Sequence, residues 1–400
     1  MTVGPAGETR TDAKPAIVGI LLDATAVPLD RGGVGRYVDA LVAALETPFY
    51  LACQARDADY YASIAPAAVI LPQSRRLEST AVRFAWEQLV LPVIAARHRV
   101  GVVHSPHYTM PLFSRAKQIV TFHDATFMSD PSVHSPLKRS FFSSWIKVSS
   151  RLADAVIVPS YSAASELARY VKRPAAGFDV AHHGVDSSIF HVPGAEEISE
   201  MSSATGLDGR GWIAFLGTLE PRKNLPALIT AYAQLARGAE SADETPFPRL
   251  AIAGGAGWET GITEAVSQVS RPGQVMLLGF IPTNRIRAFL GGSLFVAYPS
   301  LGEGFGLPVL EGMASGAPVL TTRMLAIPEV GGDAVEYTDT NSSAIEIAMK
   351  SLISDEGRRR VLAARGIERA ALFTWRNSAI IHEAVYSRFI PPVVEETAAA

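Results

Sequence analysis

The chain has 400 residues, of which 48% are hydrophobic, and this length and apolar content favour two packed domains. Its formal net charge of −3 excludes the basic excess that wholesale nucleic-acid binding requires, so we expect no nucleic-acid partner. Cys53 is the only cysteine, which excludes an intramolecular disulfide and a metal site built from cysteines. A single cysteine also fits a reducing compartment.

The two ends of the chain are polar. The first fourteen residues, MTVGPAGETRTDAK, lack the apolar segment of a signal peptide, so we expect a loose tail there, and the closing EETAAA is expected to fray. No uncharged apolar run approaches the roughly 18 residues that a membrane-spanning helix needs. The sequence therefore predicts a cytoplasmic protein, either free or at the inner face of the membrane.

Short apolar runs alternate with longer helical patterns from residue 16 onward. The first half contains expected strands at 16–22, 68–71, 101–104, 118–122 and 155–160. Between them, Val34–Leu45 repeats apolar residues at helical spacing on one face. Near-continuous apolar strands between amphipathic helices indicate a parallel sheet that helices cover on both faces.

The second half repeats this pattern. Its expected strands are 212–217, 249–255, 274–280, 293–300 and 318–322, and a final helix is expected near 375–389. The stretch 182–211 is rich in Gly, Ser and charged residues, and is predicted to link the halves. We therefore expect an amino-terminal domain over 15–200, a carboxy-terminal domain over 208–374, and a helix over 375–390 that packs back on the first domain.

Both domains are predicted to be doubly wound α/β units. In such sheets, ligands bind beyond the carboxyl ends of the strands, where the order of the strands reverses. Two of these sheets facing each other would form a cleft, and clefts between domains are preferred ligand sites.

Two glutamates stand eight residues apart in the apolar, glycine-rich stretch SLGEGFGLPVLEGMASGAPVL, residues 300–320. Carboxylates are costly in such surroundings unless a partner binds them. Pro308 suits a first helical position and Gly316 suits a helix end, which predicts a helix between them. Glu303 then lies in the loop at the carboxyl end of a strand, and Glu311 lies about one turn into the helix.

The loop between the two glutamates suits a ligand that carries both hydroxyls and phosphates. Gly304 lets the backbone approach a ligand closely. The N–H groups of Phe305, Gly306 and Leu307 lie at a helix N-terminus, where anions are stabilised. Carboxylates accept hydrogen bonds from sugar hydroxyls. One acid alone would fit a helix whose dipole it complements, but two acids flanking GFGLP favour a ligand site.

The spacing Glu303-x7-Glu311, with GFGLP inside it, resembles the EX7E motif of the retaining nucleotide-sugar glycosyltransferases of family 4. The resemblance covers nearly the whole chain, through LDRGGVGRYVDALVAAL, WEQLVLP, HSPHYTMP, FHD, HGVD, GTLEPRKNL, AGGAGW and IPEVGGDA. It implies the GT-B fold, in which two Rossmann-like, doubly wound parallel-sheet domains face each other across a cleft. It also implies transfer from a nucleotide sugar without a metal or any other cofactor.

The stretch GTLEPRKNL places two cations in a loop after the first strand of the second half. Fixed cations stabilise a departing nucleoside diphosphate more in the transition state than in the ground state. An isolated Arg-Lys pair is usually solvated surface, but the resemblance makes Arg222 and Lys223 ligands of the diphosphate. Many relatives carry arginine directly after the glycine, where this chain has Thr218.

The resemblance also assigns the remaining members of the site. It places Glu311 on the ribose hydroxyls and Glu303 on the donor sugar beside the reacting carbon. His123, in FHD, is expected near the donor sugar, and Gly33, in RGGVGRY, near the donor phosphate. A Gly-Gly-x-Gly stretch is by itself a weak signal, since tight turns share it.

The expected reaction is transfer of a hexose, with retention, to a hydroxyl of a glycan or a lipid-linked acceptor. GDP-mannose is the favoured donor, because the WEQ–LP and FHD features resemble bacterial mannosyltransferases of polysaccharide and glycolipid assembly. UDP-glucose and UDP-N-acetylglucosamine are the alternatives. His104 and His107 are candidates for the acceptor side, and the sequence does not indicate an oligomeric state.

Three other interpretations remain open at this point. Asp57-Ala58-Asp59 matches the D-x-D pattern of metal-dependent glycosyltransferases, a match that is frequent by chance. A sugar-nucleotide-binding protein without activity could share the fold. Basic residues among apolar ones over 82–99 and 135–151 fit either peripheral contact with an anionic membrane or core helices with solvated charges.

Overall fold

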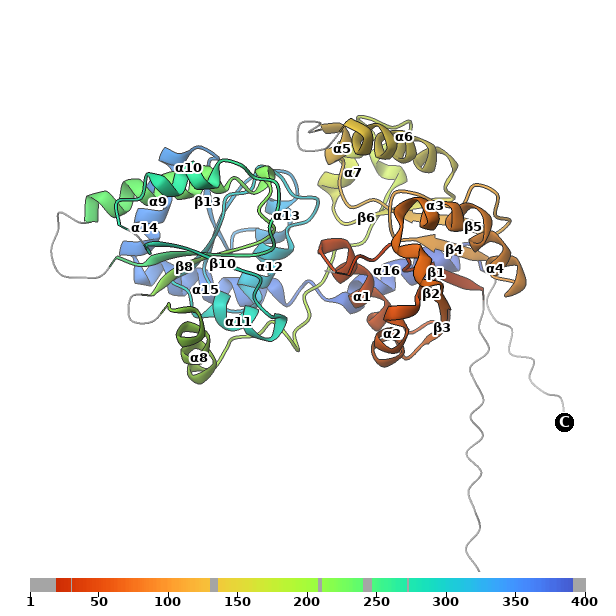
Figure 1. Ribbon diagram of the computed structural model, residues 1–400, viewed down its shortest axis with the longest axis horizontal. Helices are drawn as coiled ribbons and strands as arrows, with labels where there is room; N and C mark the ends of the chain where they lie inside the picture. Colours follow the sequence, from red (N-terminus) through yellow and green to blue (C-terminus); the bar gives the residue numbers. More distant parts are fainter. Residues whose placement is uncertain are drawn as a thin grey trace, which may run out of the picture.

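The computed structural model describes residues 19–390, apart from Asp30, 130–135, 208–210, 240–246 and Pro272. The two polar tails, and the domain limits predicted at residues 15 and 208, lie outside the described residues. Two α/β domains lie side by side, the amino-terminal one in red to yellow and the carboxy-terminal one in green to blue (Figure 1).

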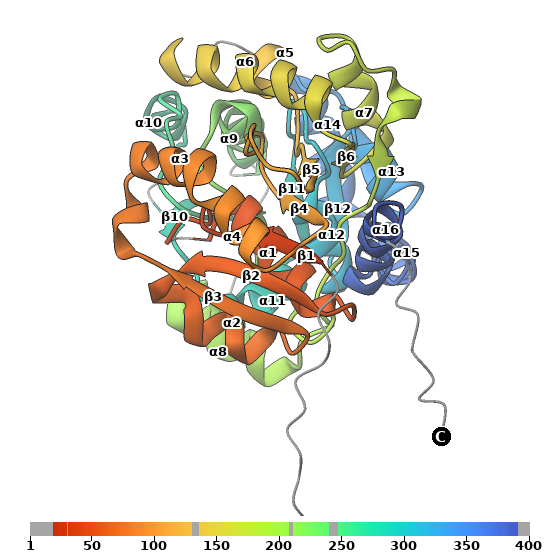
Figure 2. The ribbon, with the colours of Figure 1, turned by 90° about the vertical axis from the view of Figure 1, so that its right-hand side faces the viewer.

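The amino-terminal domain contains a seven-stranded parallel sheet in the order β3-β2-β1-β4-β5-β6-β7, most of which Figure 2 shows. Its strands are β1 (Ile20–Asp23), β2 (Phe49–Gln54), β3 (Ala68–Gln73), β4 (Val102–Ser105), β5 (Lys117–Thr121), β6 (Ala155–Val158) and β7 (Asp179–Val180). All four residues of β1, of β4 and of β6 are buried. Such strands require cover on both faces, as the apolar runs predicted.

Helices cover this sheet. They are α1 (Gly33–Ala44), α2 (Ala58–Ile64), α3 (Thr80–Leu89), α4 (Leu91–Arg97), α5 (Thr126–Ser129), α6 (Pro136–Leu152) and α7 (Tyr161–Ala168), with short 3-10 turns η1 (Ala55–Asp57), η2 (Arg75–Glu78) and η4 (Ala175–Gly177). The helix predicted over Val34–Leu45 is α1, and its Tyr37, Val38 and Leu41 are buried in the domain core as its spacing predicts.

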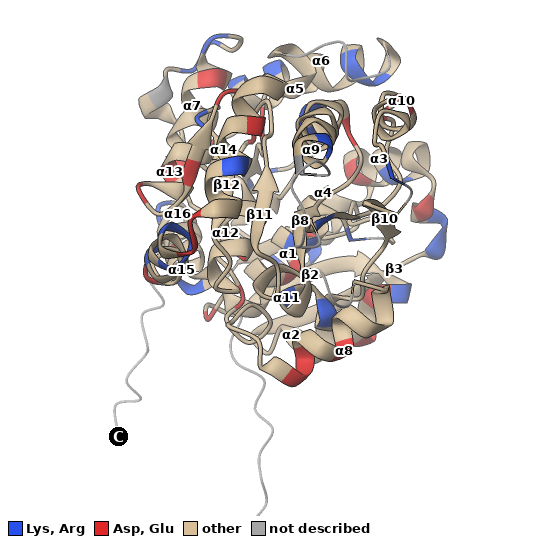
Figure 3. Ribbon diagram, turned by 90° about the vertical axis from the view of Figure 1, so that its left-hand side faces the viewer, with Lys and Arg blue, Asp and Glu red and all other residues tan. Residues whose placement is uncertain are grey.

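The carboxy-terminal domain contains a six-stranded parallel sheet in the order β10-β9-β8-β11-β12-β13. Its strands are β8 (Trp212–Leu216), β9 (Arg249–Ala253), β10 (Val275–Gly279), β11 (Phe295–Tyr298), β12 (Val319–Thr322) and β13 (Glu336–Thr338). Its helical segments are η5 (Pro221–Lys223), α9 (Leu225–Ala239), α10 (Ile262–Ser267), α11 (Thr283–Gly291), α12 (Leu307–Ala314), α13 (Ile327–Gly331), α14 (Ser342–Ser354) and α15 (Glu356–Ala370). Acidic and basic residues are mixed over this domain (Figure 3).

The stretch 182–211 is not the continuous linker that its composition predicts. Helix α8 (Ala195–Thr205) lies within it and packs on α11, and Met201 of α8 belongs to the carboxy-terminal core. Two acids in its first turn, Glu196 and Glu197, complement the helix dipole, and Gly206 ends it with a φ of 70°. The charge and glycine that suggested a linker are therefore the start and end signals of a helix.

The chain crosses between the domains twice, near Val185 and near Thr374, and the two crossing segments contact each other. Val185 forms an isolated parallel bridge with Thr374, after which α16 (Trp375–Ser387) packs on α1 of the amino-terminal domain. A Cβ on Gly184 would lie 2.1 Å from the backbone nitrogen of Trp375, so a residue with a side chain does not fit at this position.

Replacing Gly184 by alanine should therefore destabilise the protein. Overpacking at a close backbone contact costs about 1–3 kcal/mol, which chemical denaturation followed by circular dichroism would detect. The matched control is Gly238→Ala in α9, where an added Cβ has no neighbour within 4 Å and alanine favours the helix by about 0.5–1 kcal/mol. Equal stabilities of the two variants would contradict the close packing of the two passages.

Candidate active site

A cavity of about 220 Å³ lies between the two domains. Its walls are Val34, Tyr108, Asp124, Thr126 and Phe127 of the amino-terminal domain and Glu220, Arg222 and Trp258 of the carboxy-terminal domain. In both sheets the strand order reverses next to the first strand, between β1 and β4 and between β8 and β11. Arg222 follows β8 and Asp124 follows β5, so the cavity lies beyond the carboxyl ends of the strands, where such folds bind ligands.

Glu303 lies in the loop after β11, and several donors bind its carboxylate. Arg222 donates to Oε2, while Lys223 donates to Oε1 at 2.8 Å. The hydroxyls of Tyr298 and Ser300 also donate to Oε1, each at 2.8 Å. The side chain of Glu303 is only 8% exposed, so this hydrogen-bonded network replaces the water that the carboxylate loses.

The charges of this network stabilise one another. Burial alone would raise the pKa of Glu303, but the facing cations of Arg222 and Lys223 outweigh it and lower that pKa to about 2. Burial also opposes the charge of Arg222, whose pKa the Glu303 carboxylate raises above the ordinary value. Burial lowers the pKa of Lys223, although Glu303 partly offsets the shift. The structure thus brings three predicted site residues into one ionised cluster.

Glu311 is the fifth residue of α12, and its side chain is 1% exposed. Its Oε1 pairs with Arg36 of α1, across the two domains, and among the described residues no donor reaches its Oε2. A buried carboxylate oxygen without a donor is costly, so Oε2 is suited to accept a hydrogen bond from a ligand. Sequence reasoning missed Arg36, although a cation in the first turn of a helix opposes the helix dipole and indicates an anionic partner.

The glycine loop of the carboxy-terminal domain packs against the other domain. A Cβ on Gly304 would lie 1.9 Å from the carbonyl oxygen of His123, and the Ser160 hydroxyl donates to the carbonyl oxygen of Gly304 at 2.7 Å. Gly306 has a φ of 112° and precedes Leu307, the first residue of α12. The predicted need for glycine here thus has a further cause, which is contact between the domains.

The other predicted residues surround this cluster without joining it. Burial lowers the pKa of His123, whose Nε2 lies 3.1 Å from the carbonyl oxygen of Pro106. The side chain of Phe305 is 4% exposed and belongs to the carboxy-terminal core. Gly33 begins α1 on the opposite domain, where an added Cβ would have no neighbour within 4 Å.

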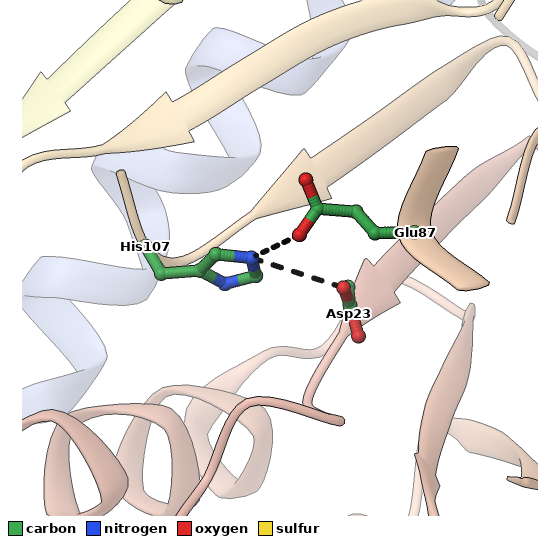
Figure 4. A group of neighbouring side chains, drawn as sticks. All are labelled: Asp23, Glu87 and His107. Atoms are coloured by element: carbon green, nitrogen blue, oxygen red, sulfur yellow. Dashed lines mark hydrogen bonds and ion pairs between the residues drawn. The ribbon is translucent and has the colours of Figure 1, made fainter. Parts of the chain in front are cut away.

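The amino-terminal domain also contains a buried group of Asp23, Glu87 and His107 (Figure 4). Nε2 of His107 lies 3.2 Å from Oε2 of Glu87 and 3.9 Å from Oδ2 of Asp23. These residue types can bind a divalent cation, but Arg83 already donates to Oε2 of Glu87 at 2.9 Å. Thr109 donates to the same oxygen at 2.6 Å, so the group forms a hydrogen-bonded network that holds the loop after β4.

The D-x-D match does not form a pair of carboxylates that face one ligand. Asp57 is buried and pairs with Arg31 at 2.7 Å, and Arg31 also pairs with Asp39 at 2.5 Å. Asp59 is exposed on α2. The first carboxylate is therefore neutralised within the protein, which disfavours the metal-dependent interpretation.

A family model described as Glycosyltransferase Family 4 matches residues 31–189, and one described as Glycosyl transferases group 1 matches residues 198–369. The chain is 29% identical over 278 residues to the O-antigen chain mannosyltransferase B of Escherichia coli, covering 69% of this chain and 71% of that protein. It is 30% identical over 237 residues to the serotype-specific mannosyltransferase WbdA of Escherichia coli, but this match covers 57% of this chain and 28% of WbdA.

Among solved structures, HepE of Anabaena, in complex with UDP and glucose, has a TM-score of 0.72 to this chain at 18% identity. The match covers 92% of this chain and 100% of that chain. At this identity the likeness concerns the fold, which is GT-B. The two family models follow each other along the chain, and each covers most of one of the two parallel-sheet domains. The chain therefore consists of a Glycosyltransferase Family 4 domain followed by a Glycosyl transferases group 1 domain, and it is a glycosyltransferase of the GT-B fold.

Proposed function

We propose that this protein transfers a hexose from a nucleotide sugar to a hydroxyl of a glycan or lipid-linked acceptor, with retention of configuration. The observation that supports this most is the ionised Glu303 carboxylate, which Arg222 and Lys223 bind beside the inter-domain cavity. Cations held in this way need no reorganisation when a diphosphate departs, which is the condition for strong electrostatic stabilisation.

In the proposed reaction, the bond between the anomeric carbon and the phosphate oxygen breaks. The acceptor oxygen forms its bond to the same face of that carbon, and its proton passes to the departing phosphate. Glu303 stabilises the positive charge that develops on the sugar, while Arg222 and Lys223 stabilise the diphosphate. No metal or other cofactor takes part in this scheme.

Donor binding should also exchange the partners of Glu311. Its Oε2 is suited to accept from a ribose hydroxyl, and the ribose would compete with Arg36 for the carboxylate. The freed guanidinium lies at the N-terminus of α1, where backbone N–H groups also favour an anion. Arg36 thereby becomes a third cation for the diphosphate. Its attraction to the bound donor would draw the amino-terminal domain toward the carboxy-terminal domain.

For the donor we propose GDP-mannose, since two Escherichia coli relatives are named as mannosyltransferases. A UDP-sugar, either UDP-glucose or UDP-N-acetylglucosamine, is the alternative. A protein that binds a sugar nucleotide without transferring it is a further alternative, against which the complete set of Glu303, Glu311, Arg222 and Lys223 argues.

Glu303→Ala and Lys223→Ala should each lower kcat about 10²–10³-fold, the scale found when one group that stabilises developing charge is removed. Transfer of labelled hexose from donor to acceptor measures this directly. Turnover of the unmodified protein should be the same with and without EDTA, because the proposed charges come from side chains.

The matched control for these variants is Glu356→Ala, since Glu356 pairs with Arg360 on an exposed face of α15 and its side chain is 65% exposed. Removing Glu303 leaves buried cations without their partner, so kcat must be normalised to the folded fraction measured by circular dichroism. Full kcat in both folded active-site variants would refute the assigned roles. Donor binding without transfer would instead favour the non-catalytic alternative.

The donor is tested by the thermal stability of the protein with a panel of nucleotides. A ligand that binds only the folded state at 100 times its Kd adds about 2.7 kcal/mol, so GDP and GDP-mannose should raise Tm more than UDP and UDP-sugars. Glu311→Gln should weaken the response to the same nucleotide. A larger response to a UDP-sugar would replace the proposed donor, and no response to any diphosphate would contradict the whole proposal.

We also propose that α3, α4 and α6 contact an anionic membrane when the acceptor is lipid-linked. Among the described residues, no helix is long and apolar enough to cross a bilayer. Trp86 of α3 is buried, but other apolar and basic side chains of these helices and the residues beside them are exposed. The exposed large apolar side chains are Val82, Leu89, Val90, Val93, Leu137, Phe141, Val148 and Leu152, and the exposed basic ones are Arg97, Arg99, Lys138, Arg139, Lys147 and Arg151. Such a mixture suits the interface of an anionic bilayer.

The protein should therefore float with phosphatidylcholine vesicles that contain phosphatidylglycerol. Replacing Lys138, Arg139 and Lys147 by glutamate should abolish flotation, since each basic residue near such a surface contributes about 1 kcal/mol. In the control variant, three basic residues of α14 and α15, namely Lys350, Arg360 and Arg365, are replaced by glutamate. This variant should float with the vesicles as the unmodified protein does. Recovery of all unmodified protein below the vesicles would end the membrane proposal.

A further inference from the structure

The residues that form the amino-terminal wall of the inter-domain cavity have no assigned role in binding the donor. Under the proposed function, on which this inference rests, Arg222 and its neighbours belong to the donor side. Transfer requires the acceptor hydroxyl to lie against the donor sugar, so the acceptor must occupy the facing wall. The residues of that wall are Val34, Tyr108, Asp124, Thr126 and Phe127.

Asp124 is the polar centre of this wall, and its carboxylate is held in one orientation. Its Oδ1 accepts hydrogen bonds from the backbone N–H of Thr126 at 3.1 Å, from the Thr126 hydroxyl at 2.9 Å and from the Tyr108 hydroxyl at 3.1 Å. Within the described part of the chain, the donors that bind this carboxylate all reach Oδ1. Since Asp124 lines the cavity, Oδ2 is the oxygen that remains for a ligand.

The loop that carries Tyr108 is fixed before any ligand arrives. Glu87 accepts from the Thr109 hydroxyl at 2.6 Å, and Gln88 donates to the carbonyl oxygen of Met110 at 2.9 Å. Ser149 of α6 donates to the carbonyl oxygen of Tyr108 at 2.9 Å. The Glu-Gln pair of WEQLVLP is thus a positioning element for this wall, and a fixed wall lowers the entropic cost of binding.

Carboxylates outnumber cations around the cavity. Of the described residues that line it, Asp124 and Glu220 carry carboxylates, whereas the one cation, Arg222, is already bound to Glu303. Of the described residues that line the amino-terminal wall, Asp124 alone carries a charge, and it is negative. A phosphate or carboxylate on the acceptor would meet like charges there, and a bound diphosphate would increase the repulsion.

We propose that the acceptor is an uncharged sugar, one of whose hydroxyls donates to Oδ2 of Asp124. The apolar C–H face of its ring packs on the aromatic side chains of Tyr108, Phe127 and Trp258. Pockets of this kind combine apolar or aromatic walls with a few fixed polar groups that set the orientation of the ligand. Trp258 is 49% exposed on the carboxy-terminal side, which leaves its ring available for a ligand.

The test compares two matched acceptors, octyl α-mannoside and the same glycoside carrying a 6-phosphate. Both are assayed with the nucleotide sugar that raises the Tm of the protein. The uncharged glycoside should have at least about tenfold higher kcat/KM. Asp124→Asn keeps an acceptor for Thr126 but removes the charge. It should raise the KM for the uncharged acceptor about tenfold. It should also reduce the ratio of the kcat/KM values of the uncharged and the phosphorylated acceptor.

The Kd of the nucleotide diphosphate should stay unchanged in Asp124→Asn, which separates the acceptor role from the donor site. Asp59→Asn makes the same chemical change on an exposed face of α2 and is the matched control. The inference is overturned by equal or better use of the phosphorylated glycoside, by an unchanged ratio in Asp124→Asn, or by no use of the uncharged glycoside in protein that binds nucleotide. Failure of the unmodified protein to bind any nucleotide diphosphate would instead overturn the proposed function.

Discussion

The carboxylate of Glu303 is almost completely removed from water, and the organisation of the carboxy-terminal site depends on how it is bound. Arg222 and Lys223 reach it from the segment after β8, while Tyr298 and Ser300 reach it from the end of β11. A buried charge that loses one partner is strongly destabilising, so these donors must be present together. The two segments are therefore tied to each other where the strand order of the sheet reverses.

The amino-terminal domain completes this site. Gly304 lies against the carbonyl oxygen of His123 and accepts, through its own carbonyl, from Ser160. Seven residues further along the chain, in α12, Glu311 pairs with Arg36 of the opposite domain. The contacts that hold the domains together thus involve the residues next to the predicted ligand groups. A ligand that competes for Glu311 must alter the domain interface. Ligand binding and the relative position of the domains are therefore coupled, because the ligand has different affinities for the two arrangements of the domains.

Sequence reasoning found the sheets because parallel strands covered on both faces are continuous apolar runs. It missed β2, whose Tyr50 and Gln54 interrupt the run although the glutamine is buried, and it missed the short strands β7 and β13, which are too short to show a period. The grouping of Glu303 with Arg222 and Lys223 in one site was implied by the resemblance to family 4, and the position of their loops after strands agrees with it. The partnership of Arg36 with Glu311 could not be predicted, because it depends on how two separately folded domains face each other.

Helix α16 has a consequence for how the chain is made. It contributes Ala379, Val385 and Tyr386 to the same core as Tyr37 and Leu41 of α1. The amino-terminal domain therefore contains residues from both ends of the described chain. Domains generally fold in the order in which they leave the ribosome. Here the amino-terminal domain keeps an apolar face of α1 uncovered until the carboxy-terminal domain has emerged, because α16, which closes the core of the amino-terminal domain, is translated after it.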